Sequence, residues 1–209
     1  MTSQTASKTV QNSTAGSGAR SRRWSWCRFG KDRSGATAIE FAILSIPFFM
    51  IIFASLETFA ALTGEQLLAN AGDTLSRKLR TGEISNIAGR STSKTEAEFR
   101  KMVCDEIAIM LPCEKDKLYI DVKSYSSFAA IPVGIPLKGT KPYVDLNDTG
   151  FSYAPGGPGT INVVRIYYRW QIITDLIRPY VTNLRPAGKT VPTDYLIVAT
   201  NAFRIENYP

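Results

Sequence analysis

The chain changes from polar to strongly apolar at residue 36. The segment 36–62 reads ATAIEFAILSIPFFMIIFASLETFAAL, and its only charged residues are Glu40 and Glu57. As a helix, a segment of this length reaches about 40 Å, which exceeds the roughly 30 Å hydrocarbon core of a bilayer. The pattern therefore predicts a transmembrane helix over residues 36–63.

The same helix is predicted to continue beyond the membrane as an amphipathic stem. Leu68, Ala71, Leu75 and Leu79 recur at steps of three and four residues, which places them on one helical face. Gly82 follows, and glycine is the residue that most often ends a helix. We expect this face of the stem to pack against the remainder of the chain.

A second, shorter helix is predicted before Pro112. Thr95 and Glu98 have the spacing of a capping box, in which each side chain binds a free backbone N–H of the other residue. One apolar face follows, made of Phe99, Val103, Ile107 and Met110.

Alternating apolar and polar residues predict strands over residues 118–123, about 161–173 and about 195–205. Residues 129–160 are rich in Pro and Gly, and they predict a long surface loop. Strands without intervening helices of a βαβ rhythm favour an α+β fold. The predicted architecture is a long N-terminal helix packed on a small antiparallel sheet, with residues 64–209 as the folded domain.

The basic charge of the chain is confined to its N-terminal segment. Residues 1–35 hold seven basic side chains and one acidic side chain, whereas the remaining residues hold 18 basic and 17 acidic. The positive-inside rule therefore predicts a cytoplasmic leader and an extracytoplasmic domain, anchored in the inner membrane by a single pass. The run 20–33 interleaves basic and aromatic residues and suits an anionic lipid surface. An RNA-binding arm is the alternative for this run, but the near-neutral domain argues against a nucleic-acid partner.

Histidine is absent from the chain, which removes the common catalytic triads and most zinc sites. We therefore expect neither an enzyme nor a cofactor or metal. Cys104 and Cys113 lie after the predicted membrane helix, and outside the cytoplasm they could form a disulfide. Two buried free thiols are the alternative.

The junction at Gly35 carries the candidate functional residues. An ionised Glu40 inside a membrane helix costs several kcal/mol unless it has a partner. Cleavage between Gly35 and Ala36 would create an α-amino group, and this cation could pair with Glu40 of a neighbouring subunit. The alternatives are an ordinary turn at Gly35 and a Glu40 side chain that reaches interfacial water. Glu57 either lies near the outer interface without a partner or has a role in assembly.

This junction resembles the class III signal of type IV prepilins and pseudopilins. The matching features are cleavage after Gly35, Glu40 at the fifth mature position and the aromatic Phe41 beside it. The wider chain looks like the TadE-like (TadE/TadF) pseudopilins of the tight-adherence, or Flp pilus, system. That wider resemblance includes Pro47 and Glu57 in the helix, RKLRTG at 77–82, PGGPG at 155–159, VVRIYYRW at 163–170 and the terminal NAFRIENYP.

The resemblance implies a pilin-like fold and the function of a minor pseudopilin in a type IV pilus involved in adherence or secretion. It also implies partners, namely a prepilin peptidase, other pilins or pseudopilins and the inner-membrane Tad assembly platform. Two alternatives remain from the sequence. One is an uncleaved bitopic membrane protein whose external domain binds a ligand, and the other is a secreted enzyme or binding module.

Overall fold

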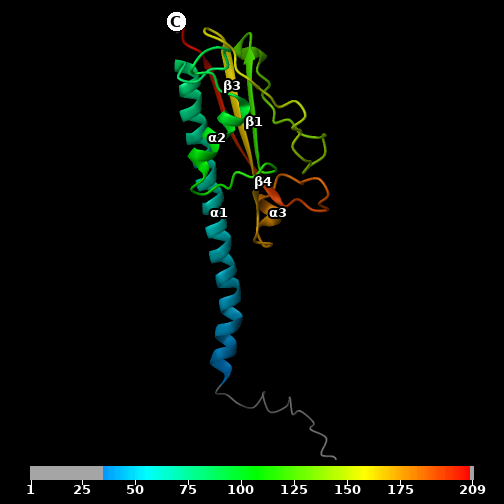
Figure 1. Cartoon of the computed structure of the whole chain (residues 1–209). Coiled ribbons are helices and arrows are strands. Elements are labelled where there is room, and N and C mark those ends of the chain that lie inside the picture. Colours follow the sequence, from blue (N-terminus) through cyan, green and yellow to red (C-terminus); the bar gives the residue numbers. More distant parts are fainter. Residues whose placement is uncertain (1–34, 208–209) are drawn as a thin grey trace, which may run out of the picture. The chain divides into compact units, whose positions relative to one another are not determined.

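The computed structural model describes residues 35–207, so the predicted leader lies outside the described residues except for Gly35. The helix α1, Ala36–Thr81, runs through Pro47 without interruption (Figure 1). It ends where Gly82 adopts a φ of 79°, a conformation that glycine adopts without strain. The predicted membrane helix and stem are thus one continuous helix. Residues from Ile46 onward form a compact unit, while the first turns of α1, up to Ser45, belong to a separate one.

Seven shorter elements follow α1 in the described part of the chain. They are α2 (Glu96–Ile107), β1 (Leu118–Tyr125), η3 (Phe128–Ala130), β2 (Tyr153–Ala154), β3 (Ile161–Gln171), α3 (Arg178–Val181) and β4 (Asp194–Arg204). The strands form one sheet in the order β2-β1-β3-β4. The predicted α+β fold is therefore confirmed.

The sheet is mixed, so the prediction of an antiparallel sheet is wrong at one edge. The pairs β1–β3 and β3–β4 are antiparallel, but β2 is parallel to β1. A parallel neighbour requires a long crossover, and the connection between β1 and β2 supplies it. Asp121 of β1 holds the end of this connection against the sheet, because its carboxylate accepts the N–H of Ser152, directly before β2, at 3.0 Å. The N–H of Val122 in turn donates to the Ser152 carbonyl at 2.7 Å.

The predicted apolar face of the stem is the centre of the core. Its four residues are each at most 2% exposed, as the periodicity predicts. They pack with apolar side chains from α2 and from one face of the sheet. These partners include Phe99, Val103, Ile107, Leu118, Ile120, Val122, Val164, Ile166 and Tyr168.

Gly72 lets the stem approach the sheet closely, because a Cβ placed on it would lie 2.7 Å from Asn201 Oδ1. Gly64 also faces the sheet, where an added Cβ would make ordinary van der Waals contact with Ile197 Cδ1 at 3.5 Å. Further along, Arg80 forms an ion pair with Glu206 at 3.3 Å. The contacts pair rising residue numbers in the stem with rising residue numbers in β4 and the residues after it. The two segments therefore run side by side and parallel.

The other face of the sheet is covered by loops. Residues 129–160 were predicted to be a surface loop, yet Leu146 within this segment is fully buried. It packs with Tyr167, whose ring stacks on Phe151 with centroids 4.9 Å apart. The surface-loop prediction is therefore wrong at Leu146, because this apolar face of the sheet needs a cover and, among the described residues, Leu146 and Phe151 of the loop pack on it.

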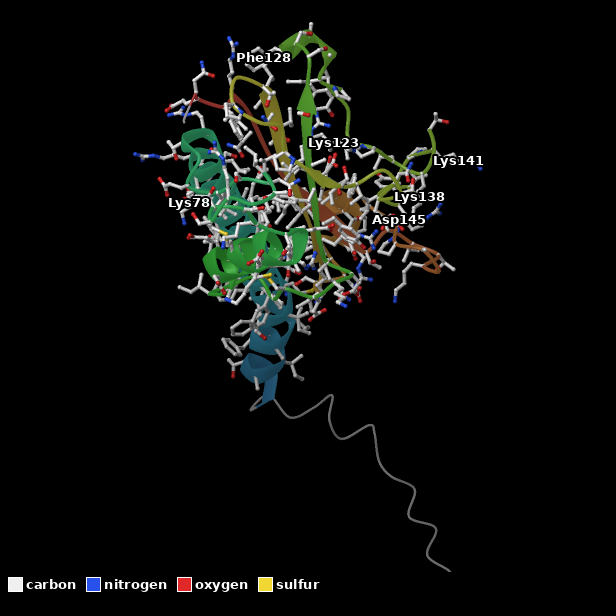
Figure 2. All side chains as sticks on the ribbon, turned by 45° about the horizontal axis from the view of Figure 1, so that its top comes forward. Lys78, Lys123, Phe128, Lys138, Lys141 and Asp145 are labelled. Atoms are coloured by element: carbon white, nitrogen blue, oxygen red, sulfur yellow. A yellow bond between two sulfur atoms is a disulfide. The ribbon has the colours of Figure 1, made fainter. Side chains whose placement is uncertain are left out.

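A buried ion pair holds this loop in place. Arg169 Nη2 lies 2.6 Å from Asp145 Oδ1, and both side chains are largely buried. Lys138 Nζ approaches the same carboxylate at 3.6 Å (Figure 2). Arg169 also lies over the ring of Tyr119 at 4.9 Å. Removing one partner of such a pair leaves the other charge buried, so these contacts fix the course of the loop.

The predicted capping box is present at the start of α2. The Thr95 hydroxyl accepts the Glu98 N–H, and the Glu98 carboxylate accepts the Thr95 N–H at 2.8 Å. This backbone hydrogen bond is the main reason why the pKa of Glu98 lies below its ordinary value. The helix ends at Ile107, earlier than the predicted Met110, because residues 108–110 form a turn.

We predict that Leu75→Ala lowers the free energy of unfolding by about 2–5 kcal/mol, since it leaves a cavity between stem and sheet. The matched control is Gln66→Ala on the exposed side of the same helix, which should change it by no more than about 0.5 kcal/mol. Urea unfolding of the full chain in detergent, followed by circular dichroism, measures both variants. Equal midpoints would contradict the assigned core.

Candidate functional site

The first half of α1 has an apolar surface that the domain leaves uncovered. Its most apolar 18-residue window has a mean hydropathy of 2.2, and only 6% of that window is buried. A core helix of a water-soluble protein would instead be mostly covered. Within the compact unit, the exposed large side chains of this surface are Ile46, Phe48, Phe49, Met50, Ile51, Phe53, Leu56, Phe59 and Leu62.

The hydroxyl groups in this apolar stretch are satisfied within the helix. Ser55, Thr58 and Thr63 each donate to a backbone carbonyl four residues earlier, at 2.8–2.9 Å. A bilayer core offers no water to bind such groups. The internal hydrogen bonds therefore lower the cost of placing these side chains in lipid.

Glu57 has a partner that the sequence could not indicate. Its carboxylate accepts the backbone N–H groups of Ile173 and Thr174, the second at 2.8 Å. These residues follow β3 and lie 116 and 117 positions away in the sequence. The sequence showed Glu57 as a charged residue within an apolar segment, but it contained no local pattern that predicts the contact with residues 173 and 174. Glu57 thus attaches the segment after β3 to α1.

The predicted processing and assembly residues lie at the beginning of α1. Gly35 directly precedes the helix, and a Cβ placed on it would meet no atom within 4 Å. Glu40 is exposed, and Phe41 is 72% exposed. None of the described residues forms an ion pair with Glu40. Their roles in cleavage and assembly stay predictions.

The structure joins Cys104 and Cys113 by a disulfide with Cα atoms 5.7 Å apart. Cys104 lies in the last turn of α2, and Cys113 lies in the turn that leads to β1. Two further contacts hold the same junction. Arg100 donates to the carbonyls of Glu114 and Leu118 at 3.0 and 2.8 Å.

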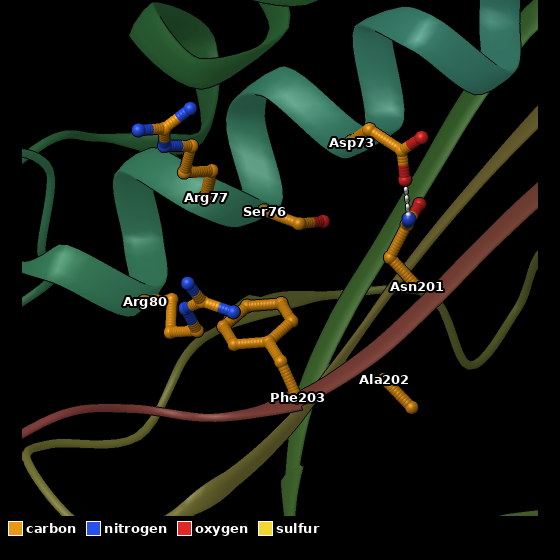
Figure 3. A pocket seen from close by; sticks show the side chains of 7 residues that line it. All are labelled: Asp73, Ser76, Arg77, Arg80, Asn201, Ala202 and Phe203. Atoms are coloured by element: carbon orange, nitrogen blue, oxygen red, sulfur yellow. Dashed lines mark hydrogen bonds between the residues drawn. The ribbon is translucent and has the colours of Figure 1, made fainter.

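A half-open groove lies between the stem and β4 (Figure 3). It is lined by Asp73, Ser76, Arg77, Arg80, Asn201, Ala202 and Phe203. Asp73 is hydrogen-bonded to Asn201 across the groove. The buried Ser76 hydroxyl has no hydrogen-bond partner within residues 35–207. The groove carries both charge signs, and it therefore selects no particular class of ligand.

The two tyrosines of the VVRIYYRW segment are packing residues. Tyr167 is 1% exposed and Tyr168 is 2% exposed, and the two point to opposite faces of the sheet. Burial raises the pKa of Tyr168 to about 12. Asn162 in the same strand was not singled out in the sequence, yet it is fully buried and its side chain accepts the Gly156 N–H at 2.8 Å. The available signal in the sequence was a polar asparagine at the start of an apolar strand, shortly after the Gly-rich stretch 155–159.

A long, largely uncovered apolar helix that continues as the stem of a small α+β domain suggests a single-pass membrane protein as the class. The family model described as "TadE-like protein" matches residues 35–77, so the resemblance found in the sequence is confirmed over this segment. The matched segment comprises the apolar stretch and most of the stem. The chain matches no curated protein and no solved structure. The motifs beyond residue 77 lie outside the family match and stay predictions.

We predict that Cys104 and Cys113 are oxidised in the native protein, because both lie in the domain predicted to be extracytoplasmic. Alkylation of membranes before and after reduction, followed by mass spectrometry, should label both thiols only after reduction. Reduction should also destabilise the domain by roughly 2–3 kcal/mol in the chain-entropy model. Full labelling of unreduced protein would exclude the bridge.

Proposed function

We propose that this chain is a minor pseudopilin, a membrane-anchored structural component in the assembly of a Tad (Flp) type IV pilus. The observation that carries the proposal is the extent of the family match. It begins at Gly35, the last residue of the predicted leader, and runs through the apolar segment into the stem. The matched part therefore comprises the proposed cleavage junction, the proposed membrane helix and most of the stem.

The proposed orientation has the N-terminus in the cytoplasm and the folded domain outside the inner membrane. The support is the charge asymmetry, because the basic excess of the chain precedes α1 and basic residues are retained on the cytoplasmic side. An extracytoplasmic domain also suits the Cys104–Cys113 bridge. The proposed partners are a prepilin peptidase, other pilins or pseudopilins and the Tad assembly platform.

Glu40 is the proposed assembly residue. An ionised carboxylate costs about 2.5–3.5 kcal/mol at the middle of a membrane helix on insertion scales, and less near its ends. Glu40 lies in the first turns of α1, and it has no ion-pair partner among residues 35–207 to offset its share of this cost. A cationic α-amino group at Ala36 of a neighbouring subunit would supply one. The benefit of Glu40 then arises in the assembled state, when helices lie side by side.

The folded domain is proposed to have a structural role and no enzymatic activity. Its candidate chemical groups are used for packing, as Tyr167, Tyr168 and Asn162 show by their burial. The groove beside the stem has an internal hydrogen bond between Asp73 and Asn201. Both observations support a scaffold more than a site that transforms a substrate.

We predict that replacing Gly35 with Leu leaves the precursor uncut, because the added side chain would crowd the peptidase at the scissile bond. Gly134→Leu is the matched control, since Gly134 is exposed and, like Gly35, has no atom within 4 Å of an added Cβ. Intact-mass spectrometry of the membrane fraction should find a wild-type chain that starts at Ala36. An intact wild-type chain in these membranes would instead support the uncleaved bitopic protein.

We predict that Glu40→Gln inserts, is cleaved and folds normally, while recovery of partner pilins and pilus formation decrease. Glutamine keeps the size of the side chain but removes the charge that the neighbouring amine would bind. Glu65→Gln is the control, because Glu65 lies in the same helix beyond the apolar stretch. Co-purification and pilus counts at matched abundance test both variants. Normal piliation of Glu40→Gln would mean that Glu40 is a solvated interfacial residue.

A further inference from the structure

The segment 173–181, which connects β3 towards β4 and includes α3, has an unusually apolar surface. Ile173 is 82% exposed, Tyr180 is 86% exposed and Leu176 is 43% exposed. The residues on either side of the segment, Ile172 and Thr182, are buried. The segment is thus anchored in the domain at both ends, and it presents its large apolar side chains outward.

Two contacts place this segment beside the uncovered part of α1. The Glu57 carboxylate accepts the N–H groups of Ile173 and Thr174. Leu176 lines an apolar pocket together with residues of α1 between Ile51 and Leu62. In Figure 1, α3 and the loop before it lie at the end of the domain where α1 emerges. The apolar surfaces of the segment and of α1 are therefore continuous.

The length of α1 gives an independent estimate of where the membrane ends. From Ala36 to Glu57 a helix spans about 30 Å, which is the thickness of a hydrocarbon core. If the apolar stretch begins at the cytoplasmic boundary, the outer boundary falls near Glu57. This is the height at which Glu57 holds the segment 173–181.

We propose that the segment 173–181 is a second membrane contact, which lies in the outer interface of the bilayer that α1 crosses. Tyrosine is enriched at this depth, where its ring meets the acyl chains and its hydroxyl meets the headgroups. The charges of the segment fit an interface, because Asp175 is paired with Arg178 at 2.5 Å. An isolated charge deeper in the bilayer would cost more. The occupant of this surface is lipid.

The contact gives the domain two points of attachment to the bilayer. A single helix leaves the domain free to tilt about its exit point, whereas a second contact beside the helix restricts that tilt. The inference rests on the proposed membrane span of α1, and the experiment must therefore report on the span separately.

The test uses full-length protein with Cys27→Ser, the native disulfide intact and one added cysteine carrying a fluorescent label. The added cysteines are Ile173→Cys, Tyr180→Cys, Phe48→Cys for the span and Val133→Cys as the control. Val133 is 99% exposed, and its neighbour Pro132 accepts a hydrogen bond from Arg165. Arg165 lies six residues before the end of β3, which is about 20 Å along the strand from the segment 173–181. Val133 is therefore an exposed position far from the proposed membrane contact. Each variant is reconstituted in vesicles of phosphatidylcholine and phosphatidylglycerol that contain nitroxide-labelled lipid.

Labels at 173 and 180 should be quenched several-fold more by the nitroxide lipid than the label at 133, and less by aqueous iodide. Quenching at 173 and 180 equal to that at 133 overturns the inference. Protection that appears only after partner pilins are added also overturns it, because the occupant is then protein. A label at 48 without lipid quenching overturns the membrane span itself, which is a different failure.

A second variant tests the role of Glu57 in holding the segment. Glu57→Ala removes the acceptor of the Ile173 and Thr174 N–H groups, so lipid quenching at 173 should fall towards the value at 133. Quenching at 48 should not change, because the span is unaffected. Unchanged quenching at 173 would show that Glu57 does not set the depth of the segment.

Discussion

The packing of the α1 stem against the sheet is the interaction on which the rest of the structure depends. One helix serves two environments, and the change occurs between Leu62, which is 52% exposed, and Leu68, which is fully buried. Within the compact unit, the large apolar side chains before this point are mostly exposed and contact the rest of the domain only around Glu57 and Leu176. Beyond it, one face of the helix is covered by α2 and three strands. Exposing the apolar stretch to water would be unfavourable, and within the compact unit this stretch and the stem belong to the same helix.

The elements that depend on local pattern could be predicted from the sequence. The spacing of Leu68, Ala71, Leu75 and Leu79 predicts the buried face, and Thr95 with Glu98 predicts the start of α2, because both signals act within one or two helical turns. The parallel pairing of β2 and the burial of Leu146 could not be predicted. Both depend on where a long connection returns to the sheet, which tertiary contacts such as Asp121 with Ser152 decide.

In the candidate site, too, local features could be proposed from the sequence and tertiary contacts could not. The residues from Gly35 to Phe41 could be proposed from the sequence, because the predicted cleavage and charge neutralisation would require a fixed local spacing, and their roles stay predictions. Glu57 was visible as a charge in an apolar run, but its partners lie more than a hundred positions away. The sequence therefore indicated that the two carboxylates in the apolar run, Glu40 and Glu57, need partners. The structure shows such a partner for Glu57, because it belongs to the same chain.

The shared direction of the stem and β4 has a mechanical consequence. From Gly64 beside Ile197, through Gly72 beside Asn201, to Arg80 beside Glu206, the contacts succeed one another along both elements. A pulling force along α1 would therefore load these rows in shear, and all of them would have to slip together. A helix that met the sheet at one end only would instead peel away row by row. The contacts between stem and β4 are thus arranged to resist axial tension better than a helix attached at one end would.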